Sequence, residues 1–361
     1  MSTTGSTTTI PVGGLTPYDV VVGPGVLTRA PDLLAGATTV AVVHDESLTQ
    51  LAQPVVDALT AAGVKTTSIA LPPGERAKTT VTVSRLWDEF ASAGLTRSDA
   101  VVAVGGGATT DVAGFAAATW LRGVRVVHVP TTLLAMVDAA IGGKTGINTD
   151  SGKNLVGAFH PPAGVFVDLD LLASLPDAEW VNGMAEVVKA GFIADPRILE
   201  LIESDPVGAA TPASPLAREL IERSIAMKAA VVSADLREAG PREMLNYGHT
   251  LGHAIERLER YAIPHGHAVS IGMVFAASLG LVSGRLDAAT ATRHRAILDR
   301  LGLPTSYRAE FLPDLLDAMQ HDKKARGSTL RFVVLDGLAK PAILSAPEPS
   351  LLTEAYAEVS G

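Results

Sequence analysis

The sequence predicts an α/β protein in which a doubly wound N-terminal domain precedes an all-helical C-terminal domain. Apolar, β-branched runs alternate with helical patterns in the first half of the chain, and a glycine triplet follows one of these runs directly. Such alternation is typical of a parallel sheet with helices on both faces. Beyond about residue 175 the β-branched runs become rare, and helical patterns continue from Asp177 to Gln320. We therefore predict two domains, residues 1–175 and 176–361, divided at Ser174–Pro176.

The strands and helices of the first domain are expected where the periodicity changes. The expected strands are Tyr18–Val22, Thr39–Val43, Thr66–Leu71, Ala100–Val104 and Arg125–Val129, with helices at about Leu48–Ala62 and Thr79–Ala93. Met1–Thr9 is rich in Ser, Thr and Gly and is expected to be a loose tail. Arg331–Leu335 is a lone strand-like run, expected in a small ribbon.

Composition excludes several classes of protein. The 361 residues carry a net charge of -9 and no Lys/Arg run, which argues against nucleic-acid binding. The absence of cysteine excludes disulfides, thiolate metal sites and a cysteine nucleophile. The N-terminus lacks the pattern of a signal peptide, and every long apolar run is interrupted by charge or glycine. We expect a cytoplasmic enzyme with no membrane association.

The glycine triplet Gly105–Gly107 lies between a buried strand and an Ala-rich helical segment, Val112–Trp120. Glycine at this place lets backbone N–H groups approach a pyrophosphate at a helix N-terminus, although a tight turn alone also uses glycine. Asp45 follows another strand and is placed to bond a ribose hydroxyl. The first domain is therefore predicted to bind a nucleotide.

Polar residues flanked by glycines follow Val129. Lys144, Lys153 and Asn154 in this stretch suit contacts to an oxyanion, but a long surface loop with solvated lysines has the same composition.

Four of the nine histidines lie within nineteen residues. His249 and His253 are four apart in a helical pattern, so both imidazoles share one face, a usual start for a divalent metal site. A polar helix face rich in histidine is the alternative. Arg242 and Asn246 add a cation and an amide beside His249, a combination suited to an anionic, hydroxyl-bearing substrate.

Six motifs, in this order and spacing, give the chain its resemblance to the 3-dehydroquinate synthases from Tyr18 to about Leu335. They are GGGATTD from Gly105, VPTTLLAMVDAAIGGKTGIN from Val129, GKNLVGAFHPP from Gly152, NGMAEVVKAG from Asn182, REMLNYGHTLGHAIE from Arg242 and HGHAVSIGM from His265. The resemblance implies an NAD- and metal-dependent, phosphate-eliminating lyase of the shikimate pathway. It also implies zinc or cobalt as the metal, a sugar-phosphate substrate, a homodimer, and a site in the cleft between a nucleotide-binding and a helical domain.

The resemblance also assigns roles to individual residues. It implies that Glu186, His249 and His265 hold the metal, an open catalytic shell that leaves His253 facing substrate. The other implied substrate contacts are Asp138, Lys189, Lys228, Arg242 and Asn246, with Lys144, Asn154 and Lys323 (or its neighbour Lys324) at the phosphate end. The implied NAD contacts are Asp45, Gly74, Glu75, Lys78, Gly106, Gly107, Ala108, Thr109, Thr110, Asp111, Thr131, Thr132, Lys144, Lys153, Leu171 and Ser174.

Two positions depart from the pattern of the family. His267 stands where many relatives have Glu, and Ser47 stands where some have Asn. On a helix His265 and His267 point about 200° apart, so we expect His265 to be the ligand and His267 to be solvated or to lie outside the ligand set.

Arg122 has two interpretations. In TWLRG it ends the helix that follows the glycine triplet, where a cation stabilises the helix dipole. The resemblance instead implies an arginine that reaches the substrate phosphate in the neighbouring subunit of a homodimer.

Three other functions share parts of these motifs. They are another sugar-phosphate cyclase, a metal-dependent polyol dehydrogenase, and an NAD-sensing protein with a dead site. The cations at Lys228 and Arg242 favour a carboxylate-bearing substrate over the first two, and the complete metal set argues against the third.

Overall fold

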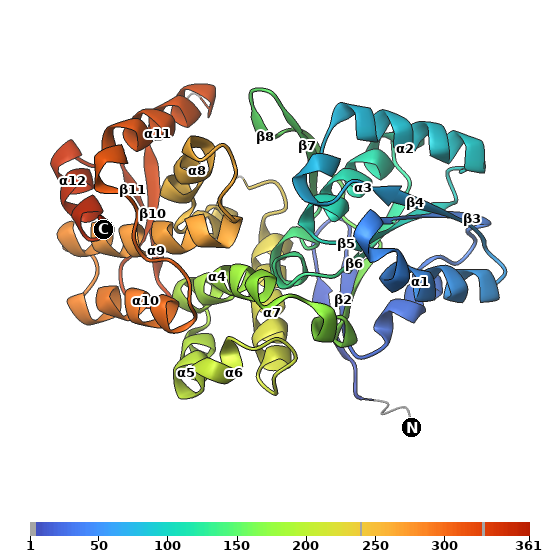
Figure 1. The fold of residues 1–361 in the computed structure, drawn as a ribbon, viewed down its shortest axis with the longest axis horizontal. Coiled ribbons are helices and arrows are strands. Elements are labelled where there is room, and N and C mark those ends of the chain that lie inside the picture. Colours follow the sequence, from blue (N-terminus) through green and yellow to red (C-terminus); the bar gives the residue numbers. More distant parts are fainter. Residues whose placement is uncertain (1–4, 239, 327–328) are drawn as a thin grey trace. The chain divides into compact units, whose positions relative to one another are not determined.

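The computed structural model describes residues 5–238, 240–326 and 329–361, with residues 321–326 described by their backbone only. The chain forms two compact units. The first comprises Met1–Pro176 with Lys228–Arg237, and the second comprises Asp177–Met227 with Glu238–Gly361. Figure 1 shows the chain coloured along its sequence. The inclusion of Lys228–Arg237 in the first unit was not anticipated from the sequence, because these residues continue a helical pattern of the second half.

The first unit is built on a seven-stranded sheet with the order β1-β2-β9-β6-β5-β3-β4. All neighbouring strands are parallel except β1, which runs antiparallel to β2 with Thr8 opposite Val22. The central strands consist of buried residues, as expected for a sheet covered on both faces. The strands are β1 (Thr8–Val12), β2 (Tyr18–Gly23), β3 (Thr39–Asp45), β4 (Lys65–Leu71), β5 (Ala100–Gly105), β6 (Arg125–Pro130) and β9 (Gly164–Asp168).

Alternate residues of the strands supply two apolar layers. Ala41 and Val43 of β3 belong to the core beneath α2 (Thr80–Ala93) and α3 (Gly107–Thr119). Phe90 of α2 is buried in the same core. Figure 1 shows α1 (Thr49–Ala61) on the other side of this sheet. The structure thus confirms the doubly wound α/β prediction and the five expected strands within a few residues.

Two segments of the first unit differ from the sequence-based expectations. Thr8 and Thr9 belong to edge strand β1, so the prediction of a loose tail is wrong for them, because Ile10 and Val12 give this segment a period of two that the polar residues obscure. The glycine-rich stretch after Val129 contains an antiparallel hairpin, β7 (Lys144–Thr149) and β8 (Gly152–Phe159), in place of a surface loop.

The second unit is mainly helical and packs around α9 (His265–Val282). Fourteen of its eighteen residues are buried. By length and composition α9 could cross a membrane, but 78% of it is buried inside the protein, as in the core helix of a soluble protein. The remaining helices are α4 (Asp177–Ile193), α5 (Pro196–Ser204), α6 (Pro206–Ala209), α8 (His249–Leu258), α10 (Ala288–Arg300), α11 (Leu312–Arg326), α12 (Pro349–Ala357) and α7 (Ala217–Ala234), whose residues from Lys228 on belong to the first unit.

The predicted ribbon is confirmed: β10 (Arg331–Leu335) pairs antiparallel with β11 (Pro341–Ser345). The second unit is largely helical, as predicted, and the ribbon packs on α9. Short 3-10 or π helices connect the larger elements of both units. They are η1 (Val26–Leu33), η2 (Glu46–Leu48), η3 (Gly74–Ala77), η4 (Trp120–Arg122), η5 (Ala135–Ala139), η6 (Leu169–Ser174), η7 (Pro241–Asn246) and η8 (Ala309–Phe311).

Asp99 fastens the loops at one end of the sheet, and its removal is expected to destabilise the protein. One carboxylate oxygen accepts bonds from the amides of Thr38 (2.8 Å) and Thr39 (2.9 Å), and the other from that of Thr96 (2.7 Å). Burial raises the pKa of Asp99, but these bonds outweigh it and bring the pKa to about 2. Asp99→Asn should lower the free energy of unfolding by about 1–3 kcal/mol at pH 7 in urea titrations.

The pH dependence provides the check on this explanation. Since the folded-state pKa lies below the ordinary aspartate value of 3.8, the stability from the ionised group is complete above about pH 4 and is lost as pH falls through about 2. The difference between wild type and Asp99→Asn should therefore shrink toward pH 2. The exposed Asp32 is the matched control, for which Asp32→Asn should change stability by no more than about 0.5 kcal/mol. A difference that does not vary with pH would exclude the charged hydrogen bonds as its cause.

Candidate active site

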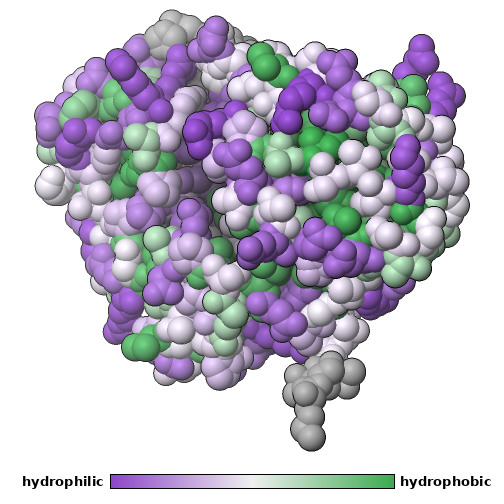
Figure 2. Space-filling model, turned by 45° about the vertical axis from the view of Figure 1, so that its right-hand side comes forward, coloured by the Kyte–Doolittle hydropathy of each residue, from purple (hydrophilic) through white to green (hydrophobic). Residues whose placement is uncertain are grey.

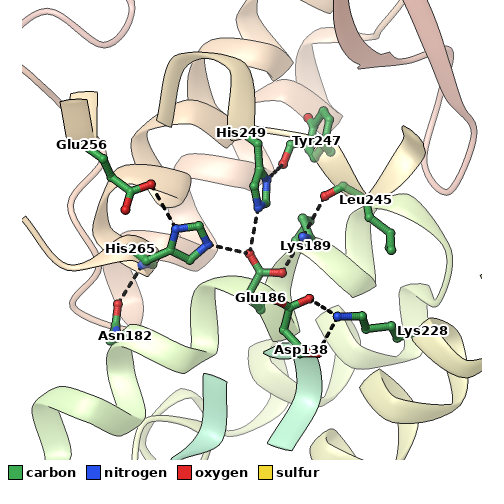
Figure 3. A network of polar contacts seen from close by, with 11 residues as sticks. Asp138, Asn182, Glu186, Lys189, Lys228, Leu245, Tyr247, His249, Glu256 and His265 are labelled. Carbon is green, nitrogen blue, oxygen red and sulfur yellow. Dashed lines mark hydrogen bonds and ion pairs between the residues drawn. The ribbon is translucent and has the colours of Figure 1, made fainter. Parts of the chain in front are cut away.

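Three helices of the second unit bring a carboxylate and two imidazoles together. Glu186 lies in the middle of α4, while His249 and His265 are the first residues of α8 and α9. Both α4 and α8 pack against α9, so buried helix contacts fix the three backbones. Figure 3 shows the two imidazoles directed at the same carboxylate oxygen.

The geometry fits a divalent metal ion. The Nε2 atoms of His249 and His265 lie 3.6 Å and 3.8 Å from Oε1 of Glu186, and all three ligand atoms fall within 4.8 Å of one another. Oε1 is buried and accepts no hydrogen bond among the described residues. A buried carboxylate oxygen without a partner is costly unless an ion or ligand occupies the space before it. One carboxylate and two imidazoles form an open shell of the kind used by catalytic zinc.

Charges around the group keep Glu186 ionised. Burial opposes ionisation, but the Lys189 ammonium and the charged His265 imidazole hold the pKa of Glu186 well below its usual value. Burial, and then the Lys189 charge, keep the pKa of His249 well below its usual value, so its imidazole is neutral and able to act as a ligand. Lys189 pairs with the other oxygen of Glu186 and donates to the Leu245 carbonyl at 2.8 Å.

Hydrogen bonds on the far side of each ring direct Nε2 toward Glu186. The Nδ1 of His249 donates to the Tyr247 carbonyl at 3.1 Å, and the Nδ1 of His265 faces Oε2 of Glu256 at 3.1 Å. Burial lowers the pKa of His265, but Glu186 and Glu256 outweigh it and raise the value to about 10. A metal ion at Nε2 therefore displaces a proton from His265.

Glu256 was missed in the sequence, although a signal was present. It lies seven residues after His249, two turns along the same face of α8. With His253 and His265 it forms a second group of potential ligands, but Nδ1 of His265 is already engaged by Glu256. This second group is better explained as the support of His265 than as another metal site.

The other histidines lie outside the main group. His253 is exposed on α8, with its ring centroid 5.2 Å from that of His249. The first interpretation, in which His249 and His253 hold the metal as a pair, is thus replaced by the set that the resemblance implied. His267 is half-buried with Glu179 as a charged neighbour, and it belongs to neither group of potential ligands among the described residues.

The remaining predicted substrate contacts are distributed over both units. In the first unit, the Lys228 ammonium on α7 donates to both the backbone carbonyl and Oδ1 of Asp138 at 2.5 Å (Figure 3). In the second unit, Arg242 is buried in η7, and the Asn246 amide donates to Glu238 at 2.7 Å.

Polar residues at the carboxyl ends of several strands form a second cluster, in the first unit. Asp45 accepts bonds from the Ser47 amide (2.9 Å) and the Gly74 amide (3.3 Å), joining the end of β3 to the loop after β4. Buried Lys78 pairs with Asp111 at 2.5 Å and also donates to Asn154. Glu75 accepts from Asn148 at 2.6 Å, which links η3 to the hairpin. Predicted residues from four separate stretches thus meet at one edge of the sheet.

No side chain caps the N-terminus of α3, the helix that contributes Asp111 to this cluster. Its N-cap is Gly106, which offers no side chain to the first amides of the helix. A Cβ at Gly105 would lie 2.6 Å from Thr109, so the tight strand–helix junction requires glycine there. Uncapped amides at the start of a thirteen-residue helix suit a pyrophosphate.

The remaining predicted residues are placed as follows. Thr131 and Leu171 are buried, whereas Lys144, Ser174 and Arg122 are exposed. Arg122 lies in η4, whose residues Leu121 and Arg122 have φ of 49° and 69°. The side chain of Lys323 lies outside the described residues. Thr109 and Thr110 are buried in α3, while Gly107, Ala108, Thr132 and Lys153 are half-buried.

A doubly wound unit with an open glycine junction, together with a helical unit that carries an open carboxylate–imidazole site, defines a nucleotide- and metal-dependent enzyme. Comparison with known proteins narrows the class. Family models described as 3-dehydroquinate synthase N-terminal and 3-dehydroquinate synthase C-terminal match residues 68–182 and 183–325. The 3-dehydroquinate synthase of Thermobifida fusca (strain YX) is 60% identical over 356 residues, covering 98% of this chain and 97% of the relative. The chain belongs to the 3-dehydroquinate synthase family.

Solved structures of related cyclases share the fold. A 2-deoxy-scyllo-inosose synthase complexed with carbaglucose-6-phosphate, NAD+ and Co2+ has a TM-score of 0.87 at 29% identity, covering 97% of this chain and 99% of that one. A 2-epi-5-epi-valiolone synthase from Streptomyces hygroscopicus subsp. jinggangensis 5008, with NAD+ and Zn2+ bound, has a TM-score of 0.86 at 26% identity, covering 95% and 96%.

Proposed function

We propose that the chain converts 3-deoxy-D-arabino-heptulosonate 7-phosphate into 3-dehydroquinate and phosphate, with NAD and zinc or cobalt. Identity of 60% to a 3-dehydroquinate synthase, against 26–29% to the other cyclases, supports this substrate over a sugar phosphate without a carboxylate. The observation that carries the proposal is the buried Oε1 of Glu186, which accepts no hydrogen bond among the described residues and faces two imidazoles. The whole reaction combines alcohol oxidation, phosphate loss, re-reduction, ring opening and aldol closure, so there is no net redox change.

The residues of the chain hold the metal ion and the substrate, and the charge of each side chain determines which of the two it binds. When bound, NAD accepts and returns a hydride, and the metal ion acts as a Lewis acid on the alcohol oxygen. Glu186, His249 and His265 hold the metal. Cations and amides hold the substrate at both ends and orient it, since charged hydrogen bonds fix an anion firmly. The carboxylate end of the substrate would be bound by Lys228, Arg242 and Asn246. The ring would lie beside Asp138, Lys189 and His253. The phosphate would be bound by Lys144, Asn154, Arg122 and Lys323.

NAD would lie along the edge of the sheet in the first unit. The uncapped amides of α3 would hold its pyrophosphate, and Asp45 would accept from a ribose hydroxyl. Asp45 already bonds two amides through its two oxygens, so it fixes the loop after β4 as well. The remaining contacts would come from Gly74, Glu75, Lys78, Gly106 to Asp111, Thr131, Thr132, Lys144, Lys153, Leu171 and Ser174.

Incubation with the heptulosonate phosphate, a catalytic amount of NAD and Co2+ tests the function. Phosphate and dehydroquinate should appear in equal amounts, many times over the NAD present, without accumulation of NADH. Stoichiometric NADH would instead indicate a polyol dehydrogenase. Turnover of a sugar phosphate that lacks a carboxylate, and not of the heptulosonate, would indicate another cyclase. NAD binding without turnover of either would leave a binding protein.

Arg242→Lys is expected to raise KM for the heptulosonate phosphate. Lysine keeps the charge but loses the planar fork, so binding should weaken by about 1–3 kcal/mol, roughly five- to 150-fold. Arg331, which pairs with Glu243 on the surface, is the matched control, and Arg331→Lys should leave KM unchanged. Steady-state kinetics of both variants decide the matter, and unaltered KM in Arg242→Lys removes Arg242 from the site.

We further propose a cytoplasmic homodimer in which each site receives Arg122 from the partner. Four large apolar side chains are exposed on η4, which contains Arg122, and on β8: Leu121, Leu155, Val156 and Phe159. These residues, which we call the η4–β8 patch, belong to neighbouring segments, since His160 after β8 bonds the Val124 carbonyl after η4 at 2.8 Å. Figure 2 shows apolar side chains gathered in patches among polar ones on one face. An apolar patch around an arginine is typical of a subunit interface.

A further inference from the structure

His249 depends on the backbone just before it for its direction. As the first residue of α8 it lies where a helix has not yet closed its own hydrogen bonds. Its Nδ1 donates to the Tyr247 carbonyl, because a carbonyl oxygen only accepts. The position of that carbonyl therefore determines both the tautomer of His249 and the direction of Nε2.

The Tyr247 side chain is anchored in the core of the second unit. It is fully buried, and its hydroxyl lies 2.8 Å from Nε2 of His294 on α10. The Nδ1 of His294 donates to the Thr290 carbonyl at 2.8 Å, so Nε2 carries the lone pair and the tyrosine hydroxyl must donate to it. The imidazole stacks on Phe192 with a centroid distance of 3.4 Å. Burial lowers the pKa of His294 to about 3, which keeps this arrangement neutral.

The other side of the same turn is fixed by close packing on α9. Gly248 has φ of 79°, and a Cβ there would lie 2.8 Å from Met273. A Cβ on Gly272 would lie 1.9 Å from the Gly248 carbonyl oxygen, so α9 approaches the turn as closely as two glycines allow. The turn before His249 is thus held by α9 on one side and by the Tyr247–His294 hydrogen bond on the other.

We propose that Tyr247 and His294 are a positioning pair that aims His249 Nε2 at the metal through the Tyr247 carbonyl. This inference rests on the proposed metal site. Nothing in the sequence singles out His294, which lies 45 residues after His249 in a helix of low apolar content. The buried bond couples α10 to a ligand that α10 itself does not contain.

Affinity for Co2+, measured by competition with a chelator, tests the pair without reliance on activity. Tyr247→Phe removes only the hydroxyl, and His294→Leu removes its acceptor. Each should weaken the Kd for Co2+ about tenfold, the lower end of what the loss of a ligand's supporting partner causes. The visible spectrum of bound Co2+ should change in both. Because both substitutions break the same bond, either variant suffices if the other does not fold. For the same reason, the double variant should lose no more than about tenfold in affinity for Co2+ relative to wild type.

Tyr356→Phe is the matched control. Tyr356 is likewise buried in the second unit, and its hydroxyl donates to the Arg308 carbonyl at 2.8 Å. The Tyr356→Phe substitution should lower the melting temperature of the metal-free protein about as much as Tyr247→Phe does, and it should leave the affinity for Co2+ unchanged. Wild-type Kd in folded Tyr247→Phe, or separate additive losses in the double variant, would overturn the inference. Absence of Co2+ binding by wild type, or normal binding by His249→Ala, would instead overturn the proposed metal site.

Discussion

His249→Ala is expected to abolish metal binding and activity together while the protein remains folded. His249 supplies one of three ligands, and loss of a ligand should weaken metal affinity by more than the ten- to hundredfold typical of a supporting partner. Alanine is a good helix former, and the side chain is removed from the first position of α8, so the helix persists. Elemental analysis, circular dichroism and turnover of the same preparation measure the three properties.

His267→Glu is the control for this experiment. It changes a histidine two residues from a proposed ligand, at a position outside the ligand group, to the glutamate that the family resemblance leads us to expect there. Metal content should remain stoichiometric and activity close to wild type. The ligand assignment fails if His249→Ala retains one metal ion per chain, and a large loss in His267→Glu would make His267 a ligand.

Mixing inactive Arg122→Ala chains with inactive His249→Ala chains should restore activity. If each site takes Arg122 from the partner, a mixed dimer holds one complete site, namely the one in the Arg122→Ala chain. With random exchange about half of the dimers are mixed, so activity near about a quarter of wild type is expected. Turnover measured against the fraction of mixed dimers, determined with differently tagged chains, gives the result.

A second mixture tests whether activity returns because Arg122 is shared between subunits or merely because two different variants form a dimer. His249→Ala and Glu186→Gln chains both carry their lesion in the metal group of their own subunit. Mixed dimers of these two variants contain no complete site and should remain inactive. If exchange is demonstrated and the Arg122→Ala mixture is inactive as well, Arg122 acts within its own chain, as the cation near the end of α3 that the sequence alone favours.

The strands and the main helices could be predicted because their patterns are local. The strands β3, β5 and β6 are rich in valine and alanine, and α2 shows its helical period between Thr79 and Gly94, which cap it. The segment before His249 was less predictable. The sequence shows a helical pattern around His249 and His253 and no sign of a break just before them, but the chain forms η7, turns at Gly248 and then starts α8. Only the close approach of α9 makes that turn necessary, and such packing leaves no periodic signal.

The candidate site shows the same difference between what local spacing predicts and what tertiary packing decides. Spacing within one helix suggested His249 and His253 as partners, but the geometry groups His249 with Glu186 and His265 from two other helices. Contacts between helices distant in sequence cannot be derived from periodicity, so that set came from the resemblance alone. Glu256 and Tyr247 were missed for a related reason. Their roles depend on which ring nitrogen faces them, and this is decided by the tertiary arrangement.

The course of α7 has a consequence for recombination and protein engineering. This helix begins in the second unit, and its last turns, from Lys228, belong to the first. There Lys228 bonds Asp138, and Ser233 accepts from the Gly13 amide at 2.6 Å. A chimera joined between residues 176 and 177 would take α7 from the other relative. It would therefore replace one partner in each of two contacts that lie within the first unit. Grafts between relatives should carry residues 228–237 along with the N-terminal segment, as a discontinuous module, to keep that unit intact.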